Sequence, residues 1–528
     1  MAPDTASHLE VEQTFETTAS TEVPDLQVDG VTTVTADRGH DLAATYHDTA
    51  DLRLLRAGIT LRRRLGGSDE GWHLKVAAPG SSDTRLELRR PAGRSRRPPI
   101  PIRRLVLGAA RGAELVPIAD IRTHRVERHL EGTDGRVLAV LAEDAVSTRV
   151  LLDQGTARAP EAAAWREIEV ELVDGDRDLL AAAAQRLGEA GIHPSRVQSK
   201  LRRALGDRLP VGDHDDGARG DGDGDGDGGG DGDGDGEQIT AGSVLRTHLE
   251  RLRDALTAYD VHVRAQQADG VHQLRIAARR IRSVLAAYRP LFVETEARRL
   301  EAELRWLGLA LSTARDLEVT DAELAGLLAG EPADRPTRNA RQVARRHLRH
   351  TTRGVSGEVG AVLTSERYLR LLDQLADLTR DPPLTEQADR PARGRLRRRA
   401  RKAYRRLAGR METAGQCAGG DRDRALHEAR KAAKRLRYAL EVAEPVIGKP
   451  ARRLRKRTKH LQQPLGAHHD SVVLRVLVRE LATSASSPAA FTLGRVHARL
   501  QHRAEELDED GLAAWSRLST PKMLRWLH

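Results

Sequence analysis

The chain of 528 residues contains one cysteine, Cys417, and its aromatic side chains make up only 3% of the sequence. A single cysteine excludes a disulfide framework and any zinc site built on several cysteines, and it suits a reducing cytoplasm. No apolar run approaches the ~20 residues that span a bilayer. The first ten residues lack the basic start and apolar core of a signal peptide. We therefore expect a soluble, cytoplasmic protein without a membrane partner, long enough for two or three domains.

Charge is distributed unevenly along the chain. Residues 1–210 hold 30 Lys and Arg against 32 Asp and Glu, residues 211–237 hold one against 11, and residues 238–528 hold 56 against 34. A strongly basic domain first suggests nucleic acid. Single-strand binding needs aromatic stacking platforms, however, and these are scarce here. Guanidinium groups without stacking partners favour a ligand that consists of phosphate without bases, so a nucleic-acid partner is disfavoured.

Residues 211–237 contain the run GDGDGDGDGGGDGDGDG. Glycine prevents stable structure and aspartates repel one another, so the run predicts an extended, flexible linker. Calcium-binding loops also alternate Asp and Gly, but the EF-hand pattern and the nonapeptide repeat with its apolar position are both absent. A further hypothesis is that this acidic segment competes with the ligand of the basic domain.

Residues 7–208 alternate in the manner of antiparallel strands with short helices between them. Period two places Glu10 with Glu12 on one strand face, and Glu167 with Glu169 on another. Such charges usually mark the solvated side of a sheet. Here the strands between these two carry paired Arg and Lys, so a closed sheet would hold carboxylates and cations in one lumen. Carboxylates there could bind Mg²⁺ or Mn²⁺, and the cations a short polyphosphate.

The segments EVEQTF, TYHDTADLRLLRAGITLRRR, GWHLKV, TRLEL and WREIEVELVDGD resemble a CYTH domain of the triphosphate tunnel metalloenzyme superfamily. The resemblance implies an eight-stranded antiparallel barrel that binds a triphosphate and a divalent metal. It implies the metal ligands Glu10, Glu12, Asp144, Glu167 and Glu169, the phosphate contacts Arg62, Arg64, Lys75, Arg85, Arg125 and Lys200, and the catalytic set Glu10, Glu12 and Lys75. The family's opening motif is E-x-E-x-K, and this chain has Thr14 at the position of the lysine. This departure bears on catalysis more than on binding.

From residue 239 onward the apolar positions recur with the period of a helix, and one basic stretch occurs twice. The copies read VHQLRIAARRIRSVLAAYRP and LHEARKAAKRLRYALEVAEP, and each is closed by a proline. In each copy, basic residues follow a histidine at three, seven and ten positions, which places all four on one helix face. A single basic amphipathic helix is usually a solvated surface. Two copies in one register predict a duplicated helical bundle with a cleft lined by guanidinium and imidazole groups.

The stretches VHQLRIAARRIR, STARDLEV, LHEARKAAKRLRY and LGAHHD resemble a CHAD domain, the conserved histidine α-helical domain, over about 240–525. The resemblance implies that inorganic polyphosphate binds in a basic channel between the two halves. The implied binding residues are His272, Arg275, Arg279, Arg282, His427, Arg430, Lys431, Lys434, Arg435 and Arg437, with Arg315, Asp316, His469 and Asp470 orienting their neighbours. A metal site on the histidines is disfavoured because no carboxylate or second histidine lies at ligand spacing in those helices.

The sequence thus predicts an α+β chain with a CYTH-like barrel at 7–208, a linker at 211–237 and a CHAD-like all-α domain at 238–528. The leading interpretation is a polyphosphate-binding protein whose barrel binds triphosphate with Mg²⁺ or Mn²⁺ and has the groups to hydrolyse it. The Thr14 departure keeps open a non-enzymatic protein that targets polyphosphate granules. Nucleic-acid binding is supported only by net charge, and cyclisation of ATP to cyclic AMP only by the first family.

Overall fold

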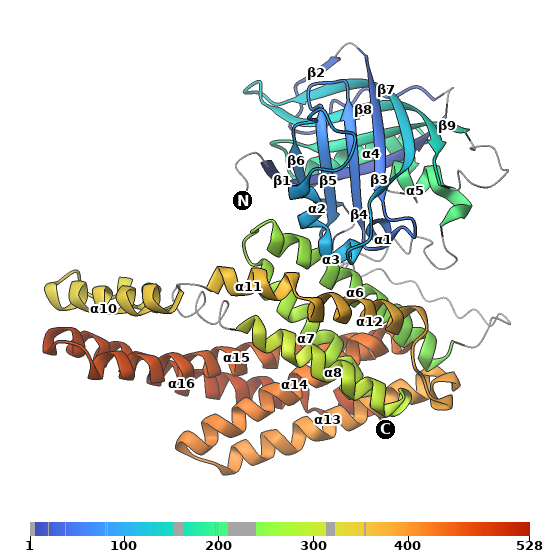
Figure 1. Ribbon diagram of the computed structural model, residues 1–528. Helices are drawn as coiled ribbons and strands as arrows, with labels where there is room; N and C mark the ends of the chain where they lie inside the picture. Colours follow the sequence, from blue (N-terminus) through green and yellow to red (C-terminus); the bar gives the residue numbers. More distant parts are fainter. Residues whose placement is uncertain are drawn as a thin grey trace. The chain divides into compact units, whose positions relative to one another are not determined.

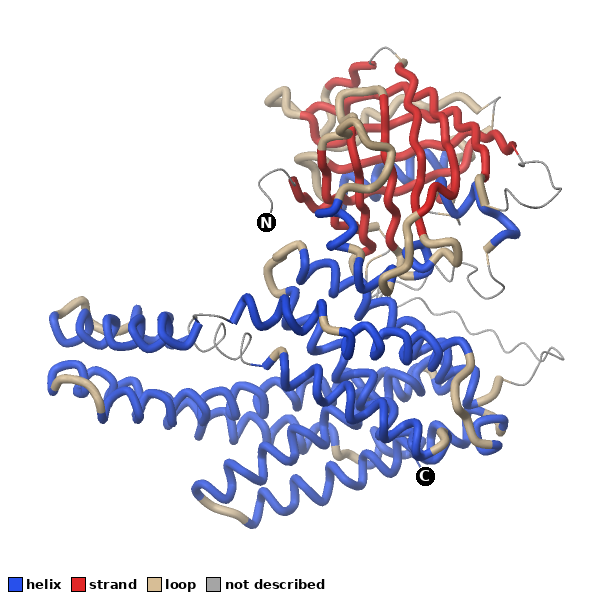
Figure 2. The backbone as a smooth tube through the Cα atoms, in the orientation of Figure 1, coloured by secondary structure: helices blue, strands red, loops and turns tan. Residues whose placement is uncertain are grey.

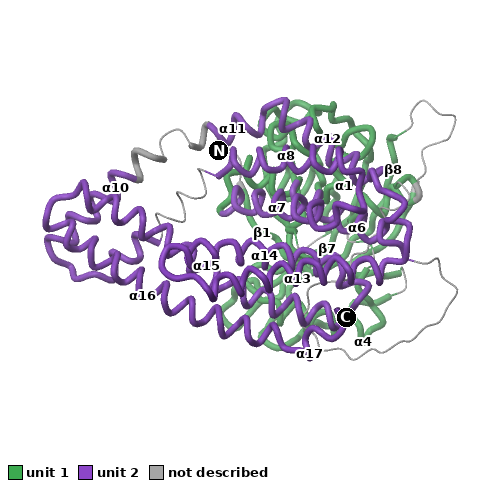
Figure 3. The backbone as a smooth tube through the Cα atoms, turned by 90° about the horizontal axis from the view of Figure 1, so that it is seen from below, with its two compact units in different colours: residues 1–231, 257–268 green, residues 232–256, 269–528 purple. Residues whose placement is uncertain are grey.

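The protein is described by a computed structural model, which covers residues 6–18, 21–36, 39–79, 81, 83–152, 162–195, 197, 199–209, 239–312, 323–352 and 355–527. It divides into two compact units, residues 1–231 with 257–268 and residues 232–256 with 269–528 (Figure 3). The predicted linker, Arg315 and Asp316 lie outside the described residues. Among the described helices, none is both long and apolar enough to cross a membrane.

The first unit is built on antiparallel strands (Figures 1 and 2). They are β1 (Ala6–Thr17), β2 (Thr33–Ala36), β3 (His40–Asp48), β4 (Ile59–Leu65), β5 (Gly71–Ala77), β6 (Thr84–Arg90), β7 (Val116–Glu131), β8 (Val137–Val150), β9 (Ala162–Leu172) and β10 (His193–Pro194). The hydrogen-bonded order β1-β6-β5-β4-β3-β7-β8-β9 returns to β1, because β1 also pairs with β9. Eight strands therefore close a barrel, as predicted, while β2 and β10 add to single strands.

Short helices join and cover the strands: α1 (Arg53–Arg56), α2 (Ile100–Leu105), α3 (Leu107–Ala110), α4 (Arg177–Glu189) and α5 (Lys200–Leu205), with a 3-10 turn at Gly206–Arg208. Alternation along the strands separates the two faces of the wall. Phe15 of β1 and Ile168 of β9 are fully buried in one apolar cluster with Leu180 and Leu187 of α4. These residues seal the outside of the barrel where β1 meets β9, and they leave the alternate positions to the lumen.

The loop after β3 shows how a buried carboxylate shapes the chain. Strand β3 continues through Tyr46 and ends at Asp48. The Asp48 carboxylate accepts the backbone N–H groups of Leu54 (2.9 Å) and Leu55 (2.9 Å), and so satisfies the otherwise unpaired start of α1. Burial raises the pKa of Asp48 to about 6, although these hydrogen bonds oppose the shift.

The second unit is helical throughout its described part. The chain's remaining helices are α6 (Ala241–Arg264), α7 (Gly270–Tyr288), α8 (Glu294–Ala310), α10 (Arg335–Thr352), α11 (Val355–Thr364), α12 (Glu366–Arg380), α13 (Ala392–Gln416), α14 (Gly419–Ile447), α15 (Lys449–Thr483), α16 (Ser487–Leu518) and α17 (Pro521–Leu524). Three 3-10 turns lie at Arg289–Leu291, Glu386–Asp389 and Arg525–Leu527. The predicted fold class, a barrel followed by an all-α region, is confirmed.

The two basic stretches form α7 and α14, which pack directly against each other. Tyr288 is fully buried at the end of α7, and its hydroxyl donates to the Ala439 carbonyl of α14 at 2.7 Å. Glu441 of α14 accepts from Arg280 of α7 at 2.8 Å. The prediction that a proline closes the second stretch is wrong, because Pro445 lies inside α14. It falls in the last turn of that helix, where its missing N–H costs a single intrahelical bond.

Candidate functional site

The closure of the barrel places two acidic strands side by side in the lumen. On β1, Glu10 (3% exposed), Glu12 (6%) and Thr14 (3%) are all buried on the inward face. The β1–β9 register sets Thr14 opposite Glu169 and Glu12 opposite Glu171. The E-x-E patterns from the two ends of the domain therefore adjoin in space.

One group of carboxylates is centred on Lys200. The Lys200 ammonium lies 2.6 Å from Glu167, 2.6 Å from Glu169 and 3.0 Å from Asp144. Arg125 of β7 donates to both oxygens of Asp144, at 2.7 and 2.6 Å, and to Glu169 at 2.6 Å. Burial works against ionisation of Asp144 and Glu169, but Lys200 and Arg125 outweigh it and hold the pKa of both carboxyls below the usual range.

A second group joins β1 to β5 and β6. The Lys75 ammonium lies 2.7 Å from Glu10 and 3.3 Å from Glu12, and Arg85 forms an ion pair with Glu12. Burial raises the pKa of Glu10, and Lys75 offsets this only in part. For Glu12 the balance reverses: Lys75 and Arg85 outweigh burial and lower its pKa. The second oxygen of Glu10 is buried and has no hydrogen-bond partner, so this group can accept a further cation or donor.

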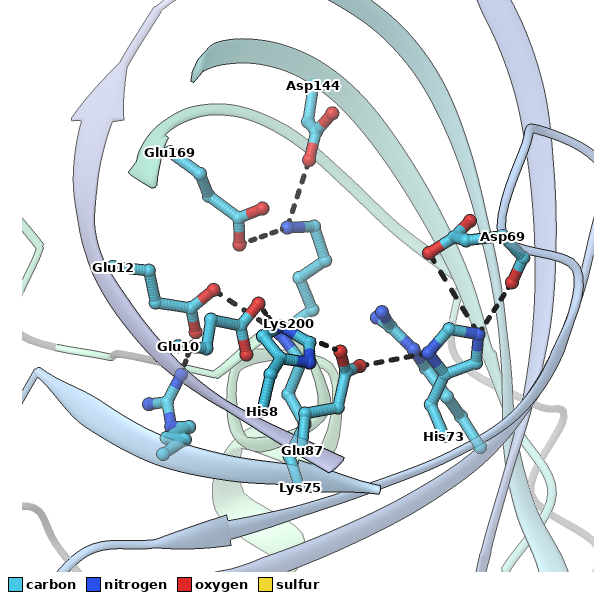
Figure 4. A network of polar contacts seen from close by, with 12 residues as sticks. His8, Glu10, Glu12, Asp69, His73, Lys75, Glu87, Asp144, Glu169 and Lys200 are labelled. Atoms are coloured by element: carbon cyan, nitrogen blue, oxygen red, sulfur yellow. Dashed lines mark hydrogen bonds and ion pairs between the residues drawn. The ribbon is translucent and has the colours of Figure 1, made fainter. Parts of the chain in front are cut away.

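A third network lies on the wall formed by β4, β5 and β6 (Figure 4). His73 is 1% exposed, and its ring contacts the Glu87 carboxylate at 2.9 Å and the Asp69 carbonyl at 2.8 Å. Asp69 also forms an ion pair with Arg64. Burial lowers the pKa of His73 to about 4, although Glu87 opposes the shift. The imidazole is therefore neutral near pH 7 and fixes the carboxylate beside the cations.

The lumen thus collects the predicted residues and adds several that were not among the predicted site residues. Glu87, His73 and Glu171 each lie two positions from a predicted residue on the same strand, and this spacing was the available signal. Burial, with Glu10 and Glu12 adding to it, raises the pKa of Glu171 to about 7. Arg62 donates to the Tyr46 hydroxyl at 3.3 Å, and its Nε is buried without a partner.

The acidic groups differ in their fitness for a divalent metal. Asp144, Glu167 and Glu169 can each offer one oxygen, and these three oxygens lie within 4.8 Å of one another. Carboxylate oxygens are the ligands that Mg²⁺ and Mn²⁺ prefer. The Lys200 ammonium contacts all three carboxylates and balances part of their negative charge. A divalent metal bound there would balance that negative charge in its place. Glu10 and Glu12 lie outside this group, and their role as metal ligands stays a prediction.

The predicted polyphosphate residues of the second unit gather along α7 and α14. They are half-buried, except for Lys431, which is exposed and forms an ion pair with Glu428 at 2.6 Å. On α14, burial and then the neighbouring guanidinium groups of Arg279 and Arg430 together lower the pKa of Lys434 to about 7. Basic groups of the two helices thus face one another closely enough to suppress ionisation.

The histidines and Asp470 flank this cluster. The rings of His427 and His469 lie 4.0 Å apart between centroids. Asp470 is 3.7 Å from Arg430, which agrees with its predicted orienting role without testing it. On α7, Arg275 donates to the Ser312 carbonyl at 3.1 Å. Burial lowers the pKa of Arg282, and the nearby guanidinium groups of Arg305 and Arg279 contribute to the same shift. His272 is half-buried on the same helix.

A closed antiparallel barrel whose lumen holds both carboxylates and cations, followed by a helical region with two packed basic helices, defines a protein of the triphosphate tunnel class with an appended domain. The CYTH domain model matches residues 8–204, and the CHAD domain model matches residues 247–479. The chain belongs to the family of proteins in which a CYTH domain is fused to a CHAD domain. CYTH domains are metal-dependent, which accords with the acidic group around Lys200.

Relatives extend over the whole chain. Two proteins of Mycobacterium tuberculosis, from strains CDC 1551 and H37Rv and both described as uncharacterised, are 35% identical over 541 residues, which cover 98% of this chain and 98% of theirs. Among solved structures, PptA from Streptomyces chartreusis aligns with a TM-score of 0.46 at 21% identity, over 53% of this chain and all of that one.

Proposed function

We propose that the barrel binds and hydrolyses a triphosphate with Mg²⁺ or Mn²⁺, and that the helical unit binds inorganic polyphosphate. The observation that supports the first part is the juxtaposition, within one lumen, of a three-carboxylate group and several buried cations. Carboxylates alone would serve a metal, and cations alone would serve an anion. Both together suit a metal–phosphate complex.

In this proposal, Asp144, Glu167 and Glu169 hold the metal. The metal would supply neutralisation of phosphate oxygens and a lower pKa for bound water. Arg62 and Arg64, on the wall stabilised by His73 and Glu87, would bind the phosphates and stabilise the charge that develops on them.

Lys75 and Arg85 have a double use in this proposal. They orient Glu10 and Glu12, and they are available to phosphate oxygens when a ligand enters. The phosphates would then compete with the two carboxylates for the same cations.

The Thr14 departure is compatible with hydrolysis on electrostatic grounds. Thr14 faces Glu169 across the β1–β9 ladder, and Glu169 already contacts both Lys200 and Arg125. A lysine at position 14 would bring a third cation to a carboxylate that already has two partners. Lys200 therefore provides positive charge at the place where the family motif has its lysine.

The test is phosphate release from inorganic triphosphate by the full-length protein, with Mg²⁺ or Mn²⁺ and with EDTA. We expect metal-dependent release that is abolished in the double variant Glu167→Gln/Glu169→Gln. Glu143→Gln is a matched control, because Glu143 neighbours Asp144 on the same strand but pairs with Arg128 at 2.6 Å. Release that persists in the double variant would refute the assigned metal site.

The density of cations on α7 and α14 supports polyphosphate as the ligand of the helical unit. Lys434 has a pKa near 7 because it is buried and, in addition, lies beside Arg279 and Arg430, and the repulsion among these cations is relieved by a polyanion. We expect salt-sensitive binding of polyphosphate that is weakened in Arg279→Gln/Arg430→Gln. If long duplex DNA displaces polyphosphate at equal phosphate concentration, the ligand assignment fails.

A non-enzymatic scaffold that targets polyphosphate granules is the second candidate, favoured by Thr14. Polyphosphate binding without any metal-dependent release would establish it in place of the hydrolase.

A further inference from the structure

Helix α13 carries far more positive charge than the helix at the equivalent place before α7. It contains nine Arg and one Lys against the single Glu412, whereas α6 contains four Arg against three acidic residues. The packing face of α13 is apolar and includes Leu396, Leu407 and Met411, so it does not account for ten basic residues. The excess charge therefore requires another explanation.

Five of these cations form one line along α13, here termed the α13 stripe: Arg395, Arg399, Lys402, Arg406 and Arg410. Spacings of three and four residues place them on one side of the helix. Arg395 and Arg399 are half-buried, and the other three are exposed.

The α13 stripe adjoins the second basic row of α14. Burial lowers the pKa of Arg435, and the guanidinium of Arg406 lowers it further. The pKa of Glu428 is held down mainly by Lys431 and also by Arg410. Arg435 in turn interacts with Arg282 of α7. The stripe is thus continuous with the cations assigned above to polyphosphate.

Arginines elsewhere in this unit are commonly paired, as Arg289 is with Glu301 at 2.7 Å and Arg367 with Glu303 at 2.8 Å. By contrast, within the described part of the chain no side chain of the α13 stripe forms an ion pair or a hydrogen bond. Glu428, which interacts with Arg410, is already paired with Lys431 at 2.6 Å, so the cations of the stripe exceed their counter-charge. Such a row repels itself and attracts a linear polyanion.

We propose that the α13 stripe binds the continuation of a polyphosphate chain whose first units lie between α7 and α14. This rests on the polyphosphate binding proposed above, and adds that affinity increases with chain length. The stripe itself contains no aromatic side chain, and Tyr404, the aromatic residue of α13, packs against Trp515 with ring centroids 6.1 Å apart. The ligand it fits is therefore phosphate without bases.

The experiment compares three full-length proteins: wild type, the triple variant Lys402→Gln/Arg406→Gln/Arg410→Gln, and a control triple, Arg338→Gln/Arg345→Gln/Arg346→Gln. The control removes the same charge from exposed positions of α10, a helix that packs on α16. Glutamine keeps a good helix propensity, so both variants should fold. Circular dichroism and the thermal midpoint verify this.

Binding of long-chain and short-chain polyphosphate is measured over a range of salt concentrations. Three lost phosphate contacts should lower the magnitude of the log–log salt slope for the long chain by about 2 to 3 and weaken binding by about 10- to 100-fold. Short chains should bind the stripe variant as tightly as wild type, and the control variant should retain its long-chain affinity.

The inference is wrong if the stripe variant binds the long chain as tightly as the control variant does, or if the stripe variant loses equal affinity for short and long chains. It is also wrong if single-stranded DNA, at equal phosphate concentration, displaces the long chain from wild type but not from the stripe variant, because the stripe would then bind nucleic acid. The proposed function fails separately, when wild type binds neither chain length.

Discussion

Replacing Lys200 by methionine should make the barrel's stability depend on a divalent metal. The ammonium contacts Asp144, Glu167 and Glu169 at 2.6 to 3.0 Å, and its side chain is only 9% exposed. Methionine is close to lysine in length but removes the one cation that contacts all three carboxylates. Asp144 and Glu169 then keep Arg125, and Glu167 keeps the Trp165 indole N–H at 2.6 Å. Removing one member of a buried ion-pair network typically costs about 3 to 5 kcal/mol, because the other charges stay buried without compensation.

A loss of that size corresponds to a fall in thermal midpoint of roughly 6 to 20 °C for a domain of this size. The measurement is the thermal unfolding of full-length wild type and Lys200→Met in EDTA and in Mn²⁺. Because a dication can replace the missing charge, Mn²⁺ should stabilise the variant much more than wild type. Arg186→Met is the control: its salt bridge with Glu189 is on the surface, and its loss should cost less than about 1 kcal/mol.

Two outcomes would refute this reasoning. If Lys200→Met is as stable as wild type in EDTA, the ammonium does not balance the three carboxylates. If Mn²⁺ stabilises wild type and variant equally, the metal and the ammonium do not share a site.

Three further predictions follow from other parts of the structure. Lys434 has a pKa near 7, so polyphosphate affinity should fall as pH rises above 7, and Lys434→Met should flatten this profile. Because the unfolded chain holds this proton up to a pKa of about 10.4, Lys434 destabilises the folded state at pH 7, and unfolding experiments should show this penalty shrinking as pH rises from 7 to 10. Asp48→Ala should destabilise the barrel by about 2 to 4 kcal/mol in denaturant unfolding, because the first N–H groups of α1 lose their acceptor. Since the folded-state pKa of Asp48 is raised to about 6, the stability that its protonation contributes in wild type should be lost as pH rises from about 4 to 6. Tyr288→Phe should cost about 1 kcal/mol by removing the hydrogen bond from Tyr288 of α7 to Ala439 of α14, and an unchanged thermal midpoint would show that this hydrogen bond does not stabilise the packing of the two helices.

Much of the fold could be predicted because it depends on local periodicity. Alternation placed Glu10 with Glu12 on one strand face, and the helical period placed the basic residues of each repeat on one helix face. The eight-stranded antiparallel barrel and the helical region followed from these patterns together with family resemblance. The proline at position 445 misled the prediction, since a proline in the last turn of a helix costs little and does not end it.

The sequence by itself determined which side chains share a face, and hence that carboxylates and cations were available for a phosphate ligand. Only the tertiary structure decided which of them meet. Barrel closure sets Glu12 opposite Glu171 and Thr14 opposite Glu169, and α5 brings Lys200 into the centre of one acidic group but not the other. The packing of α13 on α14 aligned Arg406 with Arg435. Periodicity is a property of one segment, whereas pairing register and helix packing depend on distant segments and are fixed only when the whole chain folds.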